Sequence, residues 1–250
     1  MSKLTPKQQQ RFQKNLLISG FSETDQLSLL ASSVFVVGAG GLGSPLLFYL
    51  AAAGIGKIGI CDYDQVDLSN LNRQILHRES DLGQLKTRSA RDKLKALHSG
   101  LQIELFETKL SGNNAGEFFA DYDLVIDCVD SFPIRMVIND GCLETGKPFI
   151  HAGVEGYQGQ LFTHLPGGSC LRCIFPGEGE LPEKQEPLGI LGAVAGIAGS
   201  MQAVEAVKIL TGKQSSYAGQ LVFFDFFSGT SKRIKVPKSC SSCSARIKND

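Results

Sequence analysis

A glycine-rich turn is the first stretch of this sequence whose residue types and spacing could do chemistry. Its three glycines, Gly38, Gly40 and Gly43, follow the pattern G-x-G-x-x-G. The apolar, mostly β-branched residues 34–37 predict a strand buried on both faces, and the Ser-Pro pair 44–45 predicts a helix start. Exposed backbone N–H groups and missing side chains let a phosphate approach such a turn closely. We therefore predict a nucleotide-binding turn, with a merely structural tight turn as the alternative.

Acidic and basic residues follow the ends of further predicted strands. Asp62 ends the predicted strand 58–61, 19 residues beyond Gly43, roughly where dinucleotide-binding folds place the carboxylate that binds ribose hydroxyls. An aspartate that simply ends a strand is the alternative. Asp130 follows the predicted strand 123–127 and is a candidate ligand of Mg²⁺. The cations expected nearby are Arg73, Lys86 and Arg135.

The carboxyl ends of parallel strands border a single crevice in an open α/β sheet, so we expect these groups to share one site. The pyrophosphate of a nicotinamide cofactor is served by a helix N-terminus and needs no metal ion, whereas several cations with a carboxylate suit a triphosphate. The sequence therefore predicts ATP as the ligand. An NAD-dependent oxidoreductase is the alternative from a different enzyme class.

Two Cys-x-x-Cys pairs form a second candidate site. They are Cys170 with Cys173 and Cys240 with Cys243, separated by 66 residues. Four thiolates are the number that a closed tetrahedral structural zinc site needs. A disulfide or a redox pair is the alternative, and a reducing compartment disfavours it. The remaining cysteines lie on predicted sheet or helix elements and are expected to be buried structural thiols: Cys61, Cys128 and Cys142.

Strands and helices that alternate along the chain position the first candidate site. The predicted strands of this part are 34–37, 58–61, 103–106, 123–127 and 148–151. The predicted helices are 45–53, 86–97, 112–120 and 134–145. The stretch 66–83 has no clear periodicity but carries many polar side chains and apolar anchors, so we expect it to be functional rather than disordered. The four histidines show no ligand spacing and are expected to be ordinary.

The pattern changes after residue 152. Stretches 158–165 and 220–236 predict antiparallel strands, and 193–210 predicts a helix of small residues. We predict a single α/β domain with a Rossmann-like, doubly wound sheet, parallel first and then antiparallel, and a structural zinc site. Its parts are a helical arm (1–31, with a basic helix over 5–17 and a second over 25–31), a nucleotide-binding half (32–152) and an antiparallel half (153–250) with a crossover loop (174–189).

Composition excludes several classes of partner. Lys and Arg total 25, as do Asp and Glu, so no overall field favours nucleic acid or an anionic membrane. Residues 1–10 are polar and lack the apolar core of a signal peptide. The longest nearly apolar run, 188–201, has 14 residues, which is too short to span a bilayer. We expect a cytoplasmic protein that binds neither membrane nor nucleic acid.

Several motifs together resemble one known family in order and spacing. They are Gly38 to Gly43, residues 62–74, Gly83-x-x-Lys86, Asp127-Cys128-x-Asp130, the paired Cys-x-x-Cys motifs and residues 199–206. This combination resembles the ThiF/MoeB/HesA family, bacterial relatives of ubiquitin-activating enzymes, from residue 11 to residue 243. The resemblance implies a homodimeric, zinc-containing adenylyltransferase. Such an enzyme uses MgATP to activate the C-terminal Gly-Gly carboxylate of a small ubiquitin-like sulfur carrier of the ThiS or MoaD type.

The resemblance also implies roles for individual residues. Asp62 would hold the ribose and Asp130 the Mg²⁺ ion, while Arg73 and Lys86 would stabilise the phosphates. The ATP residues carried over by position are Gly41, Asp62, Asn70, Arg73, Lys86 and Asp130. The neighbouring residues that complete the expected nucleotide site are Gly38, Gly40, Gly43, Asp64, Ser69, Asn72, Gln74 and Ser131.

Three departures from the family pattern affect the expected mechanism. The loop 174–189 has no cysteine, and Gln185 stands about where many relatives carry one, so we predict adenylation without an enzyme thioester at this loop. Lys14 stands where relatives often have an arginine that reaches the phosphates of the neighbouring subunit, and Arg11 is a second candidate for that role. Ser131 replaces a common asparagine. Family members that adenylate a peptide or a tRNA, and a catalytically silent scaffold, are the alternatives.

Overall fold

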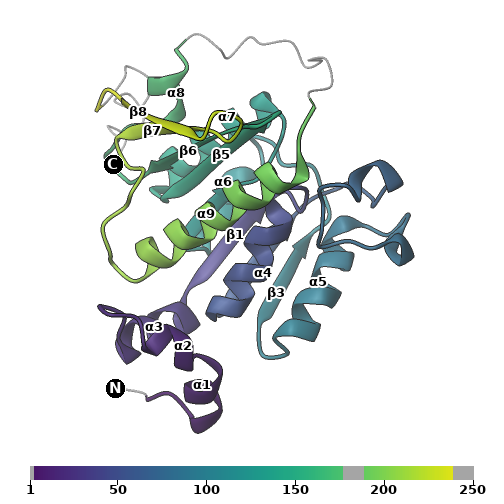
Figure 1. Ribbon diagram of the computed structural model, residues 1–250, viewed down its shortest axis with the longest axis vertical. Helices are drawn as coiled ribbons and strands as arrows, with labels where there is room; N and C mark the ends of the chain where they lie inside the picture. Colours follow the sequence, from purple (N-terminus) through teal and green to yellow (C-terminus); the bar gives the residue numbers. More distant parts are fainter. Residues whose placement is uncertain (1–2, 177–188, 239–250) are drawn as a thin grey trace.

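A mixed sheet forms the centre of the molecule, with the strand order β3-β2-β1-β4-β5-β6-β7-β8 (Figure 1). The computed structural model describes residues 3–176 and 189–238. The strands are β1 Ser33–Val37, β2 Lys57–Cys61, β3 Gln102–Phe106, β4 Leu124–Asp127, β5 Phe149–Glu155, β6 Gln158–His164, β7 Gln220–Asp225 and β8 Thr230–Lys235. Neighbours from β3 to β5 pair in parallel, and neighbours from β5 to β8 pair antiparallel. The predicted change from a parallel to an antiparallel sheet is confirmed.

Helices cover both faces of the parallel half because side chains on its strands alternate between two cores. Val34 and Val36 of β1 face the core shared with α4 and α9, whereas Phe35 faces the core shared with α6 and α7. In Figure 1, α4, α5 and α9 lie in front of the sheet. The helices of this part are α4 Gly43–Ala53, α5 Lys86–Leu97, α6 Ala115–Ala120, α7 Phe132–Thr145, α8 Leu171–Ile174 and α9 Gly192–Leu210.

The change of strand direction takes place within β5, which is longer than predicted. Its first three residues pair in parallel with β4, and all seven pair antiparallel with β6, from Phe149 opposite His164 to Glu155 opposite Gln158. The prediction ended this strand at residue 151. A two-residue connection to β6 lets the strand continue, since a tight hairpin with Gly156 at φ +55° joins the two strands.

The N-terminal arm packs at the edge of the sheet where the parallel strands begin. Its helices are α1 Pro6–Arg11, α2 Gln13–Leu16 and α3 Glu23–Ala31. The predicted single helix over 5–17 is broken at Phe12, whose backbone leaves helical geometry and whose ring is buried. A Cβ on Gly54 would lie 2.6 Å from that ring, and Gly54 adopts φ +94°, so only glycine fits there. Tertiary contact with α4 therefore overrides the helical pattern of the arm.

Helix α9 corrects the expectation about apolar length. It has 19 residues and, within the described part of the chain, is the one helix long and apolar enough to cross a membrane. The apolar run of 14 residues in the sequence is shorter than this helix, because the helix continues through polar positions. One of these, Glu205, is only 1% exposed and accepts from the Ser216 N–H at 3.0 Å. The helix packs on α4, β5 and β6, the position of a core helix.

Smaller differences have local causes. The prediction began α6 at Gly112, but the Asn114 side chain accepts from the Ser111 N–H at 2.8 Å, and this turn delays the helix to Ala115. The stretch 66–83 contains two short 3₁₀ helices, Leu68–Asn70 and Glu79–Asp81, rather than a structureless loop. The short helix α8 was not predicted.

Three buried histidines predict that the protein loses stability in mild acid. Burial lowers the pKa of each, and they are His77, His151 and His164. The unfolded chain then binds protons at a higher pH than the folded chain, so this stability is complete above about pH 6.5 and is lost as the pH falls. We expect the free energy of unfolding, measured with urea, to be lower at about pH 5.5 than at about pH 7.5. The slope is at most about 1.4 kcal/mol per pH unit for each histidine.

His151→Asn is the matched variant for this measurement. Its amide can donate to Asp127, as the His151 Nδ1 does at 2.6 Å, but it does not titrate. We expect a shallower pH slope in this variant than in the wild type. Equal unfolding free energies of the wild type at both pH values would contradict the account.

Candidate functional site

The glycine turn, residues 38–43, is so tight that two of its positions accept no side chain. Gly38 has φ +97°, and a Cβ there would lie 2.7 Å from Cys128 O. A Cβ on Gly43 would lie 2.1 Å from Gly38 O. The turn leads directly into α4, where the Ser44 N–H donates to Gly40 O at 2.9 Å and Pro45 has no N–H. The N–H groups of residues 40–43 make no hydrogen bond among the described residues and remain for a ligand. The predicted anion-binding geometry of a strand, a turn and a helix N-terminus is therefore present.

Two buried polar atoms beside the turn have no hydrogen-bond partner among the described residues. They are Ser44 Oγ and Gln74 Oε1. The Gln74 amide lies against the turn, since its Nε2 is 3.5 Å from the position of a Cβ on Gly40. Buried polar atoms nearly always have a partner, so these two mark polar space that a ligand or water would fill.

Asp62 fixes the turn from the end of β2. Its Oδ2 accepts from the Ala39 N–H at 2.8 Å, and its Oδ1 accepts from the Asp64 N–H at 2.9 Å. Burial raises the pKa of Asp62, and the nearby Lys86 ammonium opposes that shift. A carboxylate has about four acceptor positions, so lone pairs remain for a ribose hydroxyl.

Lys86 is the buried cation of the site. It begins α5, and its Nζ lies 3.0 Å from Asp64 Oδ2. The lysine side chain is 8% exposed, whereas that of Asp64 is 50% exposed. The backbone holds the same pair together, because the Lys86 N–H donates to Asp64 O at 2.9 Å. The ammonium is thus fixed at the start of a helix.

Arg73 lies between the glycine turn and the start of α9. Its Nη1 donates to Ser69 O and to Asn72 Oδ1, both at 2.9 Å. A Cβ on Gly41 would lie 3.6 Å from Arg73 Cγ, and one on Gly192 would lie 2.5 Å from Asn72 O. The segment from Ser69 to Arg73 therefore packs between Gly41 and Gly192, which are far apart in the sequence.

A buried hydrogen bond between Asp127 and His151 orders the loop after β4, since burial lowers the pKa of His151 and favours its neutral form. Asp127 Oδ2 lies 2.6 Å from His151 Nδ1, and its Oδ1 accepts from the Val129 N–H at 3.1 Å. Arg135 Nη2 donates to Val129 O at 2.8 Å. Arg135 thus stabilises the loop, and its Nε lies 3.7 Å from Asp127 Oδ2. We predicted Arg135 as a cation of the crevice, but the structure uses it inside the loop.

Asp130 sits at the tip of this loop with its side chain exposed. Within the described residues its carboxylate takes part in no hydrogen bond or ion pair, unlike Asp62 and Asp64. It is close enough to Tyr63 to contribute to the raised pKa of that phenol. A free carboxylate at the end of a parallel strand fits a hard cation such as Mg²⁺, which is commonly held by one or two carboxylates together with substrate phosphates.

The structure thus gathers most of the predicted nucleotide residues at one edge of the sheet. Among the described non-glycine residues of that set, the side chains that lie against the turn itself are those of Asp62, Arg73 and Gln74. Ser131 is the N-cap residue of α7, and its side chain makes no capping bond.

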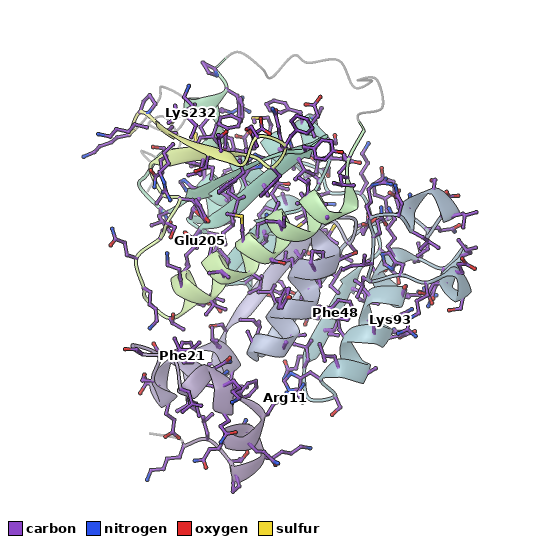
Figure 2. All side chains as sticks on the ribbon, viewed as in Figure 1. Arg11, Phe21, Phe48, Lys93, Glu205 and Lys232 are labelled. Carbon is purple, nitrogen blue, oxygen red and sulfur yellow. The ribbon has the colours of Figure 1, made fainter. Side chains whose placement is uncertain are left out.

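Arg11 and Lys14 lie far from this edge within their own chain. Arg11 Nη2 donates to Leu97 O at 2.7 Å, at the C-terminal end of α5, whereas Lys86 begins that helix. An α-helix of 12 residues is about 18 Å long. In Figure 2, Arg11, at the end of α1, lies near the lower ends of α4 and α5. Their predicted role requires the site of a second copy and stays a prediction.

The cysteines divide as expected where they are described. Burial raises the pKa of Cys61 to about 12 and raises the pKa of Cys128 and Cys142 well above the ordinary range. These three are buried structural thiols, as predicted. The Sγ atoms of Cys170 and Cys173 lie 3.8 Å apart and form no disulfide. The other residues of these predictions lie outside the described residues: Cys240, Cys243 and Gln185.

Sequence reasoning missed the buried polar residues that support the site. His151 stands opposite Asp127 in the parallel register, and Gln202 Nε2 donates to Asp127 O at 2.8 Å. His77 lies 2.9 Å from Ala39 O in the glycine turn. The available signal for His151 was its place in the strand 148–151 beside the strand that ends on Asp127. For Gln202 it was the motif 199–206, to which no role was given.

Comparison with known proteins gives the same assignment. Residues 12–245 match the ThiF family. The chain is 40% identical over 240 residues to the adenylyltransferase and sulfurtransferase MOCS3 of Mus musculus, covering 93% of this chain and 51% of that protein. It is 39% identical over 254 residues to the MOCS3 of Aedes aegypti, covering 98% of this chain and 57% of that protein. The chain spans about half the length of these curated relatives.

A solved structure shares the fold. Escherichia coli MccB, crystallised with ATP, superposes with a TM-score of 0.84 and 22% identity, over 93% of this chain and 74% of that chain. At this identity the likeness concerns the fold alone. The match over residues 12–245 and the identity to the MOCS3 proteins establish more than the fold: this chain belongs to the ThiF family.

Proposed function

We propose that this chain is an ATP-dependent adenylyltransferase that activates the C-terminal Gly-Gly carboxylate of a small ubiquitin-like sulfur carrier, of the ThiS or MoaD type. The observation that carries the proposal is the meeting of the glycine turn, Arg73, Lys86 and Asp130 at one edge of the sheet. The names of the MOCS3 relatives, which are adenylyltransferases, and the ATP bound by MccB support it.

The chemistry needs positioning rather than a general base. A terminal carboxylate has a pKa of about 3.5 and is ionised at neutral pH. The barrier lies in bringing this anion to a triphosphate and in stabilising charge on the departing pyrophosphate. The Lys86 ammonium, the Arg73 guanidinium and the N-terminus of α4 are the groups of this chain that would stabilise that charge. Asp62 would accept from a ribose hydroxyl, and Asp130 would hold Mg²⁺, which would neutralise phosphate charge.

The site fits ATP better than a nicotinamide cofactor. Lys86 is a buried cation fixed by Asp64, and Asp130 leaves a free carboxylate for a metal ion. A dinucleotide pyrophosphate at a helix N-terminus needs neither group. Arg11 and Lys14 would reach a nucleotide only in the site of a second copy, so we propose that the enzyme works as a homodimer, in the cytoplasm.

The reaction would not pass through an enzyme thioester at the loop 174–189, because that loop has no cysteine. The raised pKa values of Cys61, Cys128 and Cys142 leave little thiolate at neutral pH, which makes these buried thiols poor nucleophiles. An acid-stable, thiol-sensitive adduct of enzyme and carrier would contradict this part of the proposal.

We further propose a structural zinc ion held by Cys170, Cys173, Cys240 and Cys243. Zn–S bonds of about 2.3 Å in tetrahedral geometry place neighbouring sulfurs about 3.8 Å apart. The Cys170 and Cys173 Sγ atoms have this separation. Zinc bound to four thiolates would be closed to substrate and would contribute stability only.

Removal of the Lys86 charge tests the proposed function. We expect Lys86→Ala to lower carrier-dependent ATP–pyrophosphate exchange by roughly 10²–10³-fold, about 2.7–4 kcal/mol, as loss of an oxyanion-hole donor does. Lys57→Ala is the matched control. Lys57 also pairs with a carboxylate, Glu104 at 3.0 Å, but it lies at the start of β2, whereas the nucleotide site lies at the other end of that strand. Normal exchange by a folded Lys86→Ala protein would refute the proposed role of Lys86. Loss of exchange in both variants would show that the effect is not specific to Lys86.

Elemental analysis tests the zinc site. We expect one zinc ion per chain after purification without chelator, and its loss in Cys170→Ser, because three thiolates hold the ion more weakly. Cys142→Ala removes a buried thiol outside the set and should keep the metal. A folded wild-type chain without zinc, or equal loss of zinc in both variants, would contradict the assignment.

A further inference from the structure

A buried histidine outside the predicted site joins the glycine turn to helix α5. His77 is 5% exposed and follows the segment that carries Arg73. Its Nε2 lies 2.9 Å from Ala39 O, and its Nδ1 lies 2.8 Å from Ser89 Oγ on α5. Its backbone N–H donates to Gln74 O at 3.0 Å. One side chain therefore contacts two separate elements of the nucleotide site.

The surrounding groups define the protonation of the ring. A carbonyl oxygen can only accept, so His77 Nε2 carries a proton and donates to Ala39 O. Burial lowers the pKa of His77, and the Lys86 and Lys93 ammonium groups add to this shift, against the opposing Ala39 bond and Asp81. Burial thus favours the neutral ring, and its Nδ1 lies 2.8 Å from Ser89 Oγ.

A short polar chain continues from Ser89 to the surface. Ser89 Oγ donates to Asp81 Oδ2 at 2.9 Å, and Lys93 Nζ pairs with Asp81 and lies 3.2 Å from the same Oγ. Lys93 Nζ is a second donor to Asp81. Lys93 can be followed on α5 in Figure 2. Every member of the chain thereby has a partner, which fixes the imidazole in one orientation.

The contacts matter because of what lies beside them. The Ala39 N–H already donates to Asp62, so the His77 bond fixes the other polar group of the same residue. Because the Ala39 carbonyl shares a planar peptide group with the Gly40 N–H, the His77 bond also fixes the direction of that N–H. Ser89 stands three residues after Lys86 in α5, on the same side of the helix. His77 therefore sets the position of the turn relative to the Lys86 ammonium.

We propose that His77 is a positioning residue for the nucleotide, which holds the glycine turn and the start of α5 at the separation that one triphosphate needs. The proposal rests on the proposed function in taking MgATP as the ligand. His77 itself touches neither ligand nor reacting atoms; it acts through Ala39 and Ser89. Its loss weakens MgATP binding more than it slows the chemical step.

Titration calorimetry with MgATP, on the full chain and without carrier, tests the proposal. We expect His77→Phe to raise the Kd for MgATP roughly tenfold, equivalent to about 1.4 kcal/mol. His77→Gln places an amide donor near the position of Nε2 and should restore most of the affinity, whereas His77→Asn reaches only the position of Nδ1 and should not. In pyrophosphate exchange, the KM for ATP should rise while kcat changes less.

His164→Phe is the matched control. His164 is also buried, and its Nδ1 bonds a backbone carbonyl, Ser169 O at 2.8 Å, but it lies on β6, away from the turn. This variant should bind MgATP like the wild type. An unchanged Kd in His77→Phe, or the same loss in His164→Phe, overturns the proposal.

If His77→Phe does not fold, the Gln and Asn variants decide, because equal affinities of these two overturn the proposal. A wild-type chain that binds no MgATP overturns both this inference and the proposed function. A chain that binds MgATP but shows no carrier-dependent exchange overturns the proposed function alone.

Discussion

Close contact between backbone segments at the glycine turn determines how the strands and helices around the site are placed. Gly38 brings the turn against Cys128 O after β4, and Gly199 brings α9 against α4, where a Cβ would lie 2.3 Å from Leu42 O. Backbone atoms cannot rotate away as a side chain can, so these approaches fix β1, β4, α4 and α9 relative to one another. The nucleotide edge is the place where these contacts meet.

Charge at this edge is arranged in two layers. The buried Asp127 carboxylate, which bonds His151 and lies 3.7 Å from Arg135 Nε, orders the loop that carries Asp130, while the Lys86–Asp64 pair lies nearer the surface. Taking charges out of water costs free energy, so buried ionic groups in a crevice are more typical of a functional site than of a device for stability. In the proposed reaction, Asp127 positions the loop that carries Asp130, and Lys86 contacts the phosphates.

Local pattern was enough to predict what depends on neighbours in the chain. Three short-range signals are the apolar run before Gly38, the acid at the end of β2 and the Cys-x-x-Cys pairs. Patterns of this kind also predict the strands and the change from a parallel to an antiparallel sheet. The break at Phe12 was not predictable because it depends on Gly54, more than forty residues away. The sequence does not predict the roles of His77 and His151, because their partners, Ala39 and Asp127, become neighbours only after folding. The family resemblance supplied residue roles that spacing alone does not give, such as the carrier carboxylate as substrate.

The fate of one oxygen atom shows whether this site joins a carrier carboxylate to the α-phosphorus of ATP. A Gly-Gly carrier with its C-terminal carboxylate labelled with ¹⁸O is incubated with enzyme and MgATP, and hydroxylamine then releases the acyl group. We expect AMP that contains one labelled oxygen, with unlabelled pyrophosphate, because the attacking carboxylate oxygen stays on the phosphorus when the acyl carbon is attacked. Formation of ADP with the label in inorganic phosphate, or AMP without label, would contradict it.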